Sequence, residues 1–162
     1  MIKGLHHNAY RCRDSEQTRR FYEDFLGLPL ADAFEIRESM SGRKTSVLHS
    51  FFRLGDGSFL AFFEAPGTPF EFKAQHDYDL HIALEVDRKT LHAMLAKGRA
   101  QGIETRGIAD HGFIHSIYFR DPNGYVIELA APTDSAAGYA EKAAKQAHAA
   151  LARWQEKKVA AE

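Results

Sequence analysis

Two stretches decide the fold that this sequence predicts: LHHNAYRCRD (Leu5–Asp14) and DLHIALEVD (Asp79–Asp87). Each is a strand-like run that ends in an aspartate suited to cap a following helix. The first aspartate has Gln17 three residues later, which is a capping-box arrangement. The first helix then carries an apolar stripe and ends at Gly27, and the second stops near Gly102. A strand followed by a helix is therefore expected twice.

Three strand-like runs follow each predicted helix, so the two halves of the chain repeat one another in element order. They lie around Ala31–Glu38, Thr45–Leu54 and Ser58–Glu64 in the first half, and around Ile103–Ile108, Phe113–Arg120 and Tyr125–Ala131 in the second. The turns Gly55-Asp56-Gly57 and Asp121-Pro122-Asn123-Gly124 each join the last two runs of a half.

The element order predicts an α+β fold in which two βαβββ modules form a curved mixed-sheet cup, followed by a C-terminal helix. We expect one domain over residues 1–133, composed of module one (1–66), a linker (67–77) and module two (78–133). The remaining residues, 134–162, are predicted to form a helical extension rich in alanine, lysine and glutamate. We assign this extension to packing or to an oligomer contact, and give it no chemistry.

Composition excludes several classes of protein. A chain of 162 residues with 44% hydrophobic content is long enough for one ordinary domain with a core. Its formal net charge of −1 lacks the broad basic surface of a nucleic-acid binder. The single cysteine, Cys12, cannot form an internal disulfide. With no signal peptide evident and no long apolar run, we expect no membrane span and a cytoplasmic location.

Alternation along the strands identifies candidate metal ligands. In the run around His81, the apolar side chains occupy one face and the histidine the other. Glu128 likewise opposes its apolar neighbours. His7 opens the first half where His81 opens the second, and Glu64 closes the first half where Glu128 closes the second. The repeat thus predicts four potential ligands, and His6 is the alternative to His7.

We predict that His7, His81 and Glu128 bind one divalent metal ion. A lone strand histidine is more often structural, so the prediction depends on the recurrence of these positions in both halves. Two imidazoles and one carboxylate suit Fe(II), Mn(II), Zn(II) or Ni(II), and they leave coordination positions open for a substrate.

These residues resemble a known family. The opening stretch, with Phe21-Tyr22 and Leu26-Gly27-Leu28, looks like the first module of the vicinal-oxygen-chelate superfamily. The stretches around His81 and over Asp121–Leu129 look like its second module, so the resemblance covers about residues 1 to 133. The superfamily includes glyoxalase I, extradiol dioxygenases, methylmalonyl-CoA epimerase, and fosfomycin- and bleomycin-resistance proteins. It implies a metal-dependent enzyme whose small-molecule substrate presents two neighbouring oxygens, and the homodimer is the expected assembly.

A narrower resemblance concerns the extradiol ring-cleaving dioxygenases. Their signature is similar to the spacing of His111, Tyr118 and Glu128, with Ala109 as a slight departure. It implies that His111 is the acid/base, Tyr118 the hydrogen-bond partner of a catechol-like substrate, and Glu128 a ligand of Fe(II). His115 is a weaker substitute for His111. We expect an aromatic pocket with candidate lining residues Phe62, Phe113 and Tyr118.

Two alternatives remain open at this point. If Glu64 also binds the metal, the site resembles a glyoxalase I-like lyase or an epimerase, in which Glu64 or Glu128 removes a proton beside a carbonyl. Such a shell would leave no position for O2. The second alternative is a non-catalytic binding protein like the bleomycin-sequestering relatives. The sequence determines neither the substrate nor whether the site forms within one chain or across a dimer.

Overall fold

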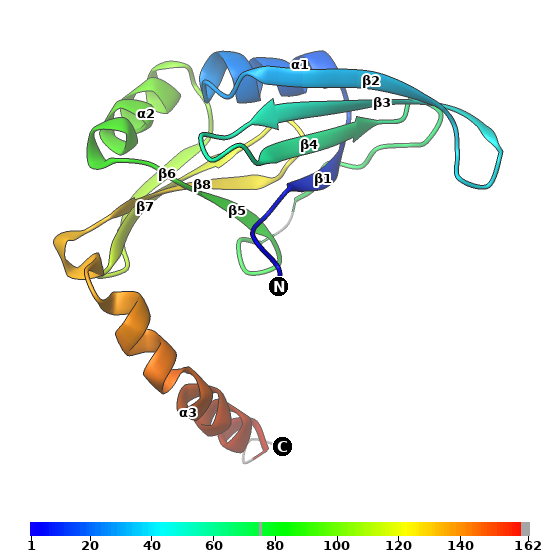
Figure 1. Cartoon of the computed structure of the whole chain (residues 1–162). Helices are drawn as coiled ribbons and strands as arrows, with labels where there is room; N and C mark the ends of the chain where they lie inside the picture. Colours follow the sequence, from blue (N-terminus) through cyan, green and yellow to red (C-terminus); the bar gives the residue numbers. More distant parts are fainter. Residues whose placement is uncertain (75, 160–162) are drawn as a thin grey trace. The chain divides into compact units, whose positions relative to one another are not determined.

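A computed structural model describes residues 1–74 and 76–159, so Gln75 of the predicted linker and the last three residues of the extension lie outside it. The residues described in this way form eight strands, which Figure 1 labels: β1 (His7–Cys12), β2 (Leu30–Glu38), β3 (Lys44–Arg53), β4 (Phe59–Glu64), β5 (His81–Glu85), β6 (Thr105–Asp110), β7 (Ile114–Arg120) and β8 (Val126–Pro132). The helical elements are α1 (Ser15–Arg19), η1 (Arg20–Phe25), α2 (Arg88–Ala100), η2 (Asp134–Ala136) and α3 (Tyr139–Val159). The predicted order of elements is confirmed.

The strands form two four-stranded sheets with the same internal order, β1-β4-β3-β2 and β5-β8-β7-β6. In the first sheet β1 pairs with β4 in parallel, whereas β3 pairs antiparallel with both β4 and β2. The α+β class and the repeated module are therefore confirmed. The contacts between residues divide the described chain into two compact units. The first unit consists of residues 1–82 and 119–127, and the second consists of residues 83–118 and the chain from 128 onward.

Both predicted helix starts are capped as expected. The Asp14 carboxylate accepts a 2.7 Å hydrogen bond from the backbone N–H of Gln17, and the Asp87 carboxylate accepts one of 2.6 Å from Thr90. The first helix turns into a π-helix, η1, and three aromatic side chains of that segment are buried. An apolar stripe does not distinguish these two helical forms, so the sequence did not predict the change.

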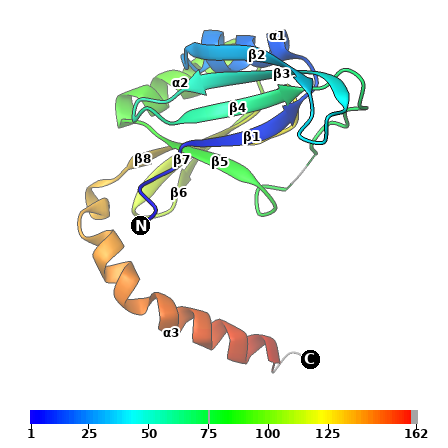
Figure 2. The ribbon, with the colours of Figure 1, turned by 45° about the vertical axis from the view of Figure 1, so that its right-hand side comes forward.

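The core of the first unit lies between η1 and one face of the first sheet, the face across which α1 lies in Figure 2. The ring of Tyr22 packs 4.7 Å from that of Phe62 and 5.5 Å from that of Phe52, and all three residues are fully buried. The prediction that Phe62 lines a substrate pocket is therefore wrong. The alternation of β4 places Phe62 on the sheet face that the helix covers. Burial of its ring there removes apolar surface from water and so stabilises the core.

The Asp121–Gly124 turn packs against the first helix. The Tyr22 hydroxyl donates a 3.0 Å hydrogen bond to the Asp121 carboxylate, and the Asn123 amide donates one of 3.3 Å to the Thr18 hydroxyl. The Asn123 side-chain carbonyl also accepts from the backbone N–H of Arg13 at 2.9 Å. Burial raises the pKa of the Asp121 carboxyl above its ordinary value, although several hydrogen bonds oppose the shift.

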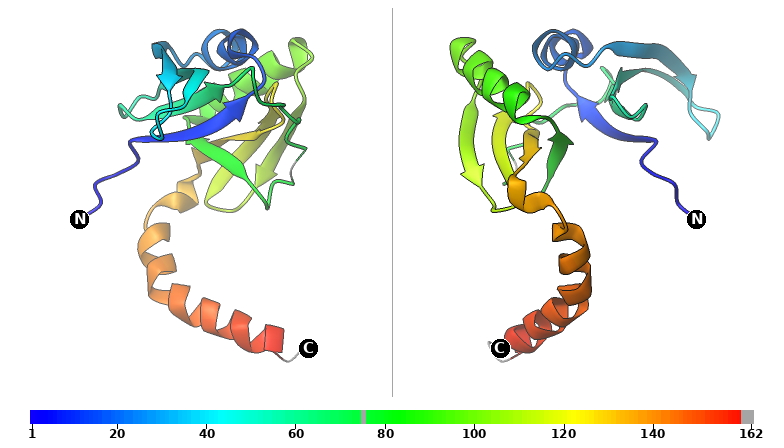
Figure 3. Two further views of the ribbon diagram at one scale, coloured as in Figure 1. Left: turned by 90° about the vertical axis from the view of Figure 1, so that its right-hand side faces the viewer. Right: turned by 60° about the vertical axis from the view of Figure 1, so that its left-hand side comes forward.

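The C-terminal extension is held to the rest of the second unit near its start, where the Arg88 guanidinium on α2 pairs with the Asp134 carboxylate at 2.8 Å and Thr133 contacts the turn between β6 and β7. The backbone N–H of Thr133 donates to the Phe113 carbonyl at 3.0 Å, and the Thr133 hydroxyl donates to that of Gly112 at 2.7 Å. From there α3 runs away from the strands of its unit (Figure 3), and the side chains of Leu151 and Trp154 are exposed. Among the described residues, none of the helices combines the length and the apolar character that crossing a membrane requires.

Candidate metal centre and its neighbourhood

His7 begins β1 and faces away from the covered core. Its side chain is exposed, whereas that of Cys12, five residues along the same strand, is buried. The His7 ring lies 5.5 Å from the ring of Phe51 and 6.2 Å from that of His49. The Nδ1 atoms of His6 and His7 are 2.8 Å apart. His7 therefore lies on the sheet face opposite the helix, which we call the open face.

The open face is aromatic, and it contains a histidine that the sequence analysis missed. His49 on β3 is buried, and its Nδ1–H donates to the Phe62 carbonyl at 3.0 Å. Its ring stacks 3.8 Å from that of Phe63, and the Phe34 ring lies 5.5 Å away. The signal was available, because a hairpin around Gly55-Asp56-Gly57 pairs His49 with Phe63 and so places them on one face.

His81 opens β5 with the alternation that the sequence predicted. Its side chain and that of Ala83 are exposed, whereas Ile82 and Leu84 are less accessible. The His81 Nδ1 lies 2.8 Å from the Asp77 backbone carbonyl. A carbonyl only accepts, so Nδ1 carries the proton and the neutral ring has its lone pair on Nε2. Metal-binding histidines are commonly oriented by such a hydrogen bond.

Glu128 is buried on β8, with only 5% of its surface exposed. Its Oε1 accepts a 2.5 Å hydrogen bond from the Ser116 hydroxyl on β7. Ser116 was missed in the sequence analysis, although it alternates with Tyr118 and so shares its face. The serine fixes the orientation of a carboxylate that would otherwise rotate, as hydrogen bonds to metal-binding carboxylates do.

The three predicted ligands, His7, His81 and Glu128, each have separate local contacts in the described residues. Within residues 1–74 and 76–159 there is no group of three or more His, Cys, Asp or Glu side chains placed to hold a metal ion. The grouping of His7, His81 and Glu128 around one ion therefore stays a prediction.

Glu64 occupies the opposite end of the first sheet from His7. In the parallel pair of β1 with β4, His7 is opposite Phe59 and Glu64 is opposite Cys12. Five residues of strand separate the two positions, which is roughly 16 Å. Glu64 also belongs to the covered face, where its Oε2 accepts a 2.7 Å hydrogen bond from the backbone N–H of Ser15 at the start of α1. Within one chain, Glu64 therefore cannot share an ion with His7.

The proposed equivalence of Glu64 with Glu128 in the repeat is wrong. Each hairpin turn ends at a glycine with positive φ, Gly57 at 88° and Gly124 at 96°. Glu128 is the fourth residue after its glycine, and the fourth residue after Gly57 is Ala61. Glu64 is the seventh residue after Gly57, three positions beyond Ala61. Because successive strand residues point to opposite faces, this odd number places Glu64 on the opposite face of the sheet from Ala61. The first module therefore has alanine where the second has a carboxylate.

His111 and Tyr118, predicted to serve the substrate, are in contact. The Nε2 of His111 lies 3.0 Å from the hydroxyl of Tyr118, and the Arg106 guanidinium lies 5.2 Å from the centre of the Tyr118 ring. Because Tyr118 is two residues from Ser116 on β7, it shares the face on which Glu128 lies. His115 instead has its Nε2 3.6 Å from the Asp110 carboxylate.

Known proteins resemble this chain over both modules. Residues 4–129 match the family model described as Glyoxalase/Bleomycin resistance protein/Dioxygenase superfamily. The metallothiol transferase FosB of Shouchella clausii is 26% identical over 140 residues, which cover 80% of each chain. The fosfomycin resistance protein FosX of Mesorhizobium loti is 27% identical with a TM-score of 0.56, over 83% of this chain and 97% of that one.

A FosX structure from Listeria monocytogenes, in complex with Mn(II) and sulfate, has the same fold with a TM-score of 0.61 at 20% identity. It covers 83% of this chain and 96% of that one. The matched span of the family model contains both modules and all three predicted ligands, and it takes in well over half of the sequence. This chain therefore belongs to the glyoxalase/bleomycin resistance protein/dioxygenase superfamily.

Proposed function

We propose that this protein is a metal-dependent enzyme that holds a divalent ion through His7, His81 and Glu128. Its substrate is a catechol-like ring that is cleaved with O2. The contact between His111 and Tyr118 carries the proposal, because an acid/base and a substrate-binding hydroxyl at 3.0 Å form a unit able to move a proton. Membership of the superfamily supports the proposal that the chain binds a metal ion. The FosX protein of Listeria monocytogenes, which has the same fold, binds Mn(II).

The donor set fits a divalent transition metal. His81 is held by Asp77 as a tautomer with its lone pair on Nε2, and Glu128 is held by Ser116. Both arrangements prepare a ligand before any ion arrives. The bound ion would supply Lewis-acid and electron-transfer chemistry to a substrate with two neighbouring oxygens, and three protein ligands leave room for that substrate. Fe(II) suits the oxygen-dependent reaction, and Mn(II), Zn(II) or Ni(II) suit the same donors.

The residues of the chain have separate roles in this proposal. His111 removes a proton from a substrate hydroxyl and later returns it, with Nε2 as the atom that carries it. Tyr118 hydrogen-bonds both to His111 and to a substrate oxygen, which orients the ring. The aromatic open face beside His7, with Phe34 and Phe51 stacked at 5.9 Å, suits a flat and apolar substrate body.

The test is to load the purified protein anaerobically with Fe(II) and then add catechols and O2. The expected result is O2 consumption together with a yellow ring-opened product. His7→Ala and His81→Ala should abolish turnover, with unfolding midpoints close to that of the wild-type protein. A protein that binds Fe(II) yet consumes no O2 with any catechol would contradict the dioxygenase.

The glyoxalase-like alternative has less support. It requires a fourth ligand on the first module, and Ala61 stands at the position equivalent to Glu128. Glu64 instead accepts a backbone hydrogen bond at a helix start. Glu64→Gln separates the two functions, because it should leave dioxygenase turnover in place and abolish any isomerase activity that depended on this carboxylate.

A second candidate is metal-assisted opening of a phosphonate epoxide. The similarity to a metallothiol transferase and to fosfomycin resistance proteins favours it. The same three ligands would hold the ion. A thiol or water would bond to an epoxide carbon as its C–O bond breaks, and the released oxygen would take up the proton that the nucleophile loses. Incubation of the Mn(II)-loaded protein with fosfomycin, with and without a thiol, tests this candidate. A non-catalytic binder remains as a third, and it would retain no metal through His7, His81 and Glu128.

A further inference from the structure

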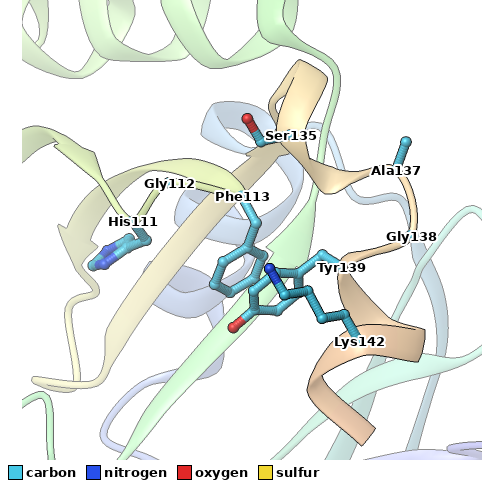
Figure 4. Close-up of a pocket in the computed structure, with 8 residues that line it drawn as sticks. All are labelled: His111, Gly112, Phe113, Ser135, Ala137, Gly138, Tyr139 and Lys142. Atoms are coloured by element: carbon cyan, nitrogen blue, oxygen red, sulfur yellow. The ribbon is translucent and has the colours of Figure 1, made fainter. Parts of the chain in front are cut away.

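A pocket of about 430 Å³ lies where the C-terminal extension meets the turn between β6 and β7 (Figure 4). The turn and the extension both line it, through His111, Gly112, Phe113, Ser135, Ala137, Gly138, Tyr139 and Lys142. The extension residues lie beyond residue 129, where the family match ends. The hydrogen bonds of Thr133 to the turn hold this added wall in place. The pocket is thus built partly by residues that lie beyond the family match.

The lining combines a flat aromatic wall with positive charge. The rings of Phe113 and Tyr139 stack at 3.9 Å with planes 6° apart. Lys142 reaches from α3 toward these rings, as Figure 4 shows, and no lining residue is acidic. A carboxylate placed here would meet the Lys142 ammonium group. The nearby Asp110 carboxylate already accepts a 2.7 Å hydrogen bond from the backbone N–H of Gly112. An aromatic or apolar body would lie against the stacked rings.

The pocket shares one residue with the proposed catalytic pair. His111 lines the pocket, and its Nε2 contacts the hydroxyl of Tyr118. A molecule that occupies the pocket therefore lies next to His111, whose ring points away from the rings of Phe113 and Tyr139 in Figure 4. A volume of 430 Å³ is in the range of sites for small molecules, which runs from about 300 to 1,000 Å³.

We propose that this pocket binds the acidic end of the substrate, so the substrate class is an aromatic carboxylic acid. Lys142 recognises the carboxylate, and the stack of Phe113 and Tyr139 supports the adjoining apolar part. The assignment of this ligand as the substrate rests on the proposed function, whereas the binding of an aromatic carboxylate does not.

The test is equilibrium binding to the metal-free protein, measured by calorimetry with two matched probes, 3-phenylpropionate and 3-phenyl-1-propanol. The probes share the ring and the chain and differ only in the acidic group. The acid should bind more tightly than the alcohol by about three- to tenfold, as expected for a charge-assisted contact at a partly exposed site.

Variants assign the contacts. Lys142→Met should remove the preference for the acid and leave the affinity for the alcohol unchanged. Tyr139→Leu should lower the affinity for both the acid and the alcohol. Lys145→Met is the matched control, because Lys145 lies on the same helix and does not line the pocket. This variant should bind both probes with the affinity of the wild type. Circular dichroism of each variant should show that α3 is retained.

The proposal is overturned if acid and alcohol bind equally, if neither binds at millimolar concentration, or if Lys142→Met and Lys145→Met have the same effect. These outcomes are independent of turnover, because the binding is measured without metal or O2. A protein that binds the acid as predicted but cleaves no catechol would contradict the proposed function and leave the pocket assignment standing.

Discussion

The hydroxyl of Tyr22 donates a 3.0 Å hydrogen bond to the carboxylate of Asp121, although 99 residues separate them in sequence. Both side chains are buried. The same carboxylate accepts from the backbone N–H groups of Asn123 and Tyr125, at 2.9 and 2.8 Å. The turn of module two is therefore attached to the helix of module one through buried polar groups that depend on one another.

Removing the Tyr22 hydroxyl should destabilise the protein. Tyr22→Phe keeps the ring that packs on Phe62 but deprives a buried carboxylate of one donor. The expected loss in free energy of unfolding is about 1–3 kcal/mol, measured by urea denaturation. Tyr78→Phe is the control, because the Tyr78 side chain is fully exposed and its change should be near zero. Equal stability of the two variants would contradict the role of this hydrogen bond.

The titration of Asp121 should give stability a definite dependence on pH. Burial raises the pKa of Asp121 above its usual 3.8. A folded-state pKa above the unfolded value gives stabilisation that is complete below the unfolded pKa and is lost as pH rises through the folded pKa. Asparagine does not titrate, so the stability of the wild type relative to Asp121→Asn should shrink as pH rises from the unfolded-state pKa through the raised folded-state pKa. A relative stability that grew with pH would show that hydrogen bonds outweigh burial.

Gly124 is required by the backbone of the linker. A Cβ atom there would lie 2.6 Å from the backbone nitrogen of Lys73, which donates to the Asn123 carbonyl. Gly124→Ala should therefore destabilise by about 3 kcal/mol or more, measured by thermal and urea unfolding. Gly57→Ala is the matched control, because Gly57 has a similar φ of 88° in open space. Gly57→Ala should lower the free energy of unfolding by only about 1 kcal/mol, which is the cost of placing alanine at a positive φ. Similar losses at both glycines would exclude the contact.

His111 and His115 should differ in their effect on turnover. His111→Ala should lower kcat by about 10²- to 10⁴-fold, because it removes the proposed acid/base. Tyr118→Phe should cause a smaller loss and alter the pH profile of kcat/KM. His115→Ala should retain activity, since His115 faces Asp110. Metal content per chain, measured for each variant, should stay unchanged. A larger loss at His115 would reverse the assignment.

Mixing two inactive variants distinguishes a site within one chain from a site across a dimer. If His7 of one copy joins His81 and Glu128 of another, a heterodimer of His7→Ala with His81→Ala regains one intact site of its two. Random reassortment should then restore about a quarter of wild-type activity. Activity that stayed at zero, with mixed dimers confirmed by mass spectrometry, would place the site within one chain.

The sequence by itself determined the element order, the two capped helices and the alternation that exposes His81. These features follow from local rules: a capping aspartate, a glycine with positive φ and the two-residue period of a strand act within a few residues. The pairing of the hairpin around Gly55-Asp56-Gly57 was equally local. The resemblance added the family, which the match over residues 4–129 then showed.

Tertiary structure decided what sequence position alone could not. Glu64 resembled Glu128 because both end a module in the sequence, but register separates them by three residues and by the face of the sheet. Phe62 and Phe113 are both aromatic residues that the sequence assigned to one pocket, yet Phe62 lies in the core and Phe113 lines a pocket with Tyr139. Burial and long-range hydrogen bonds, such as that of Tyr22 with Asp121, depend on which elements meet, and a periodic pattern carries no information about its partner.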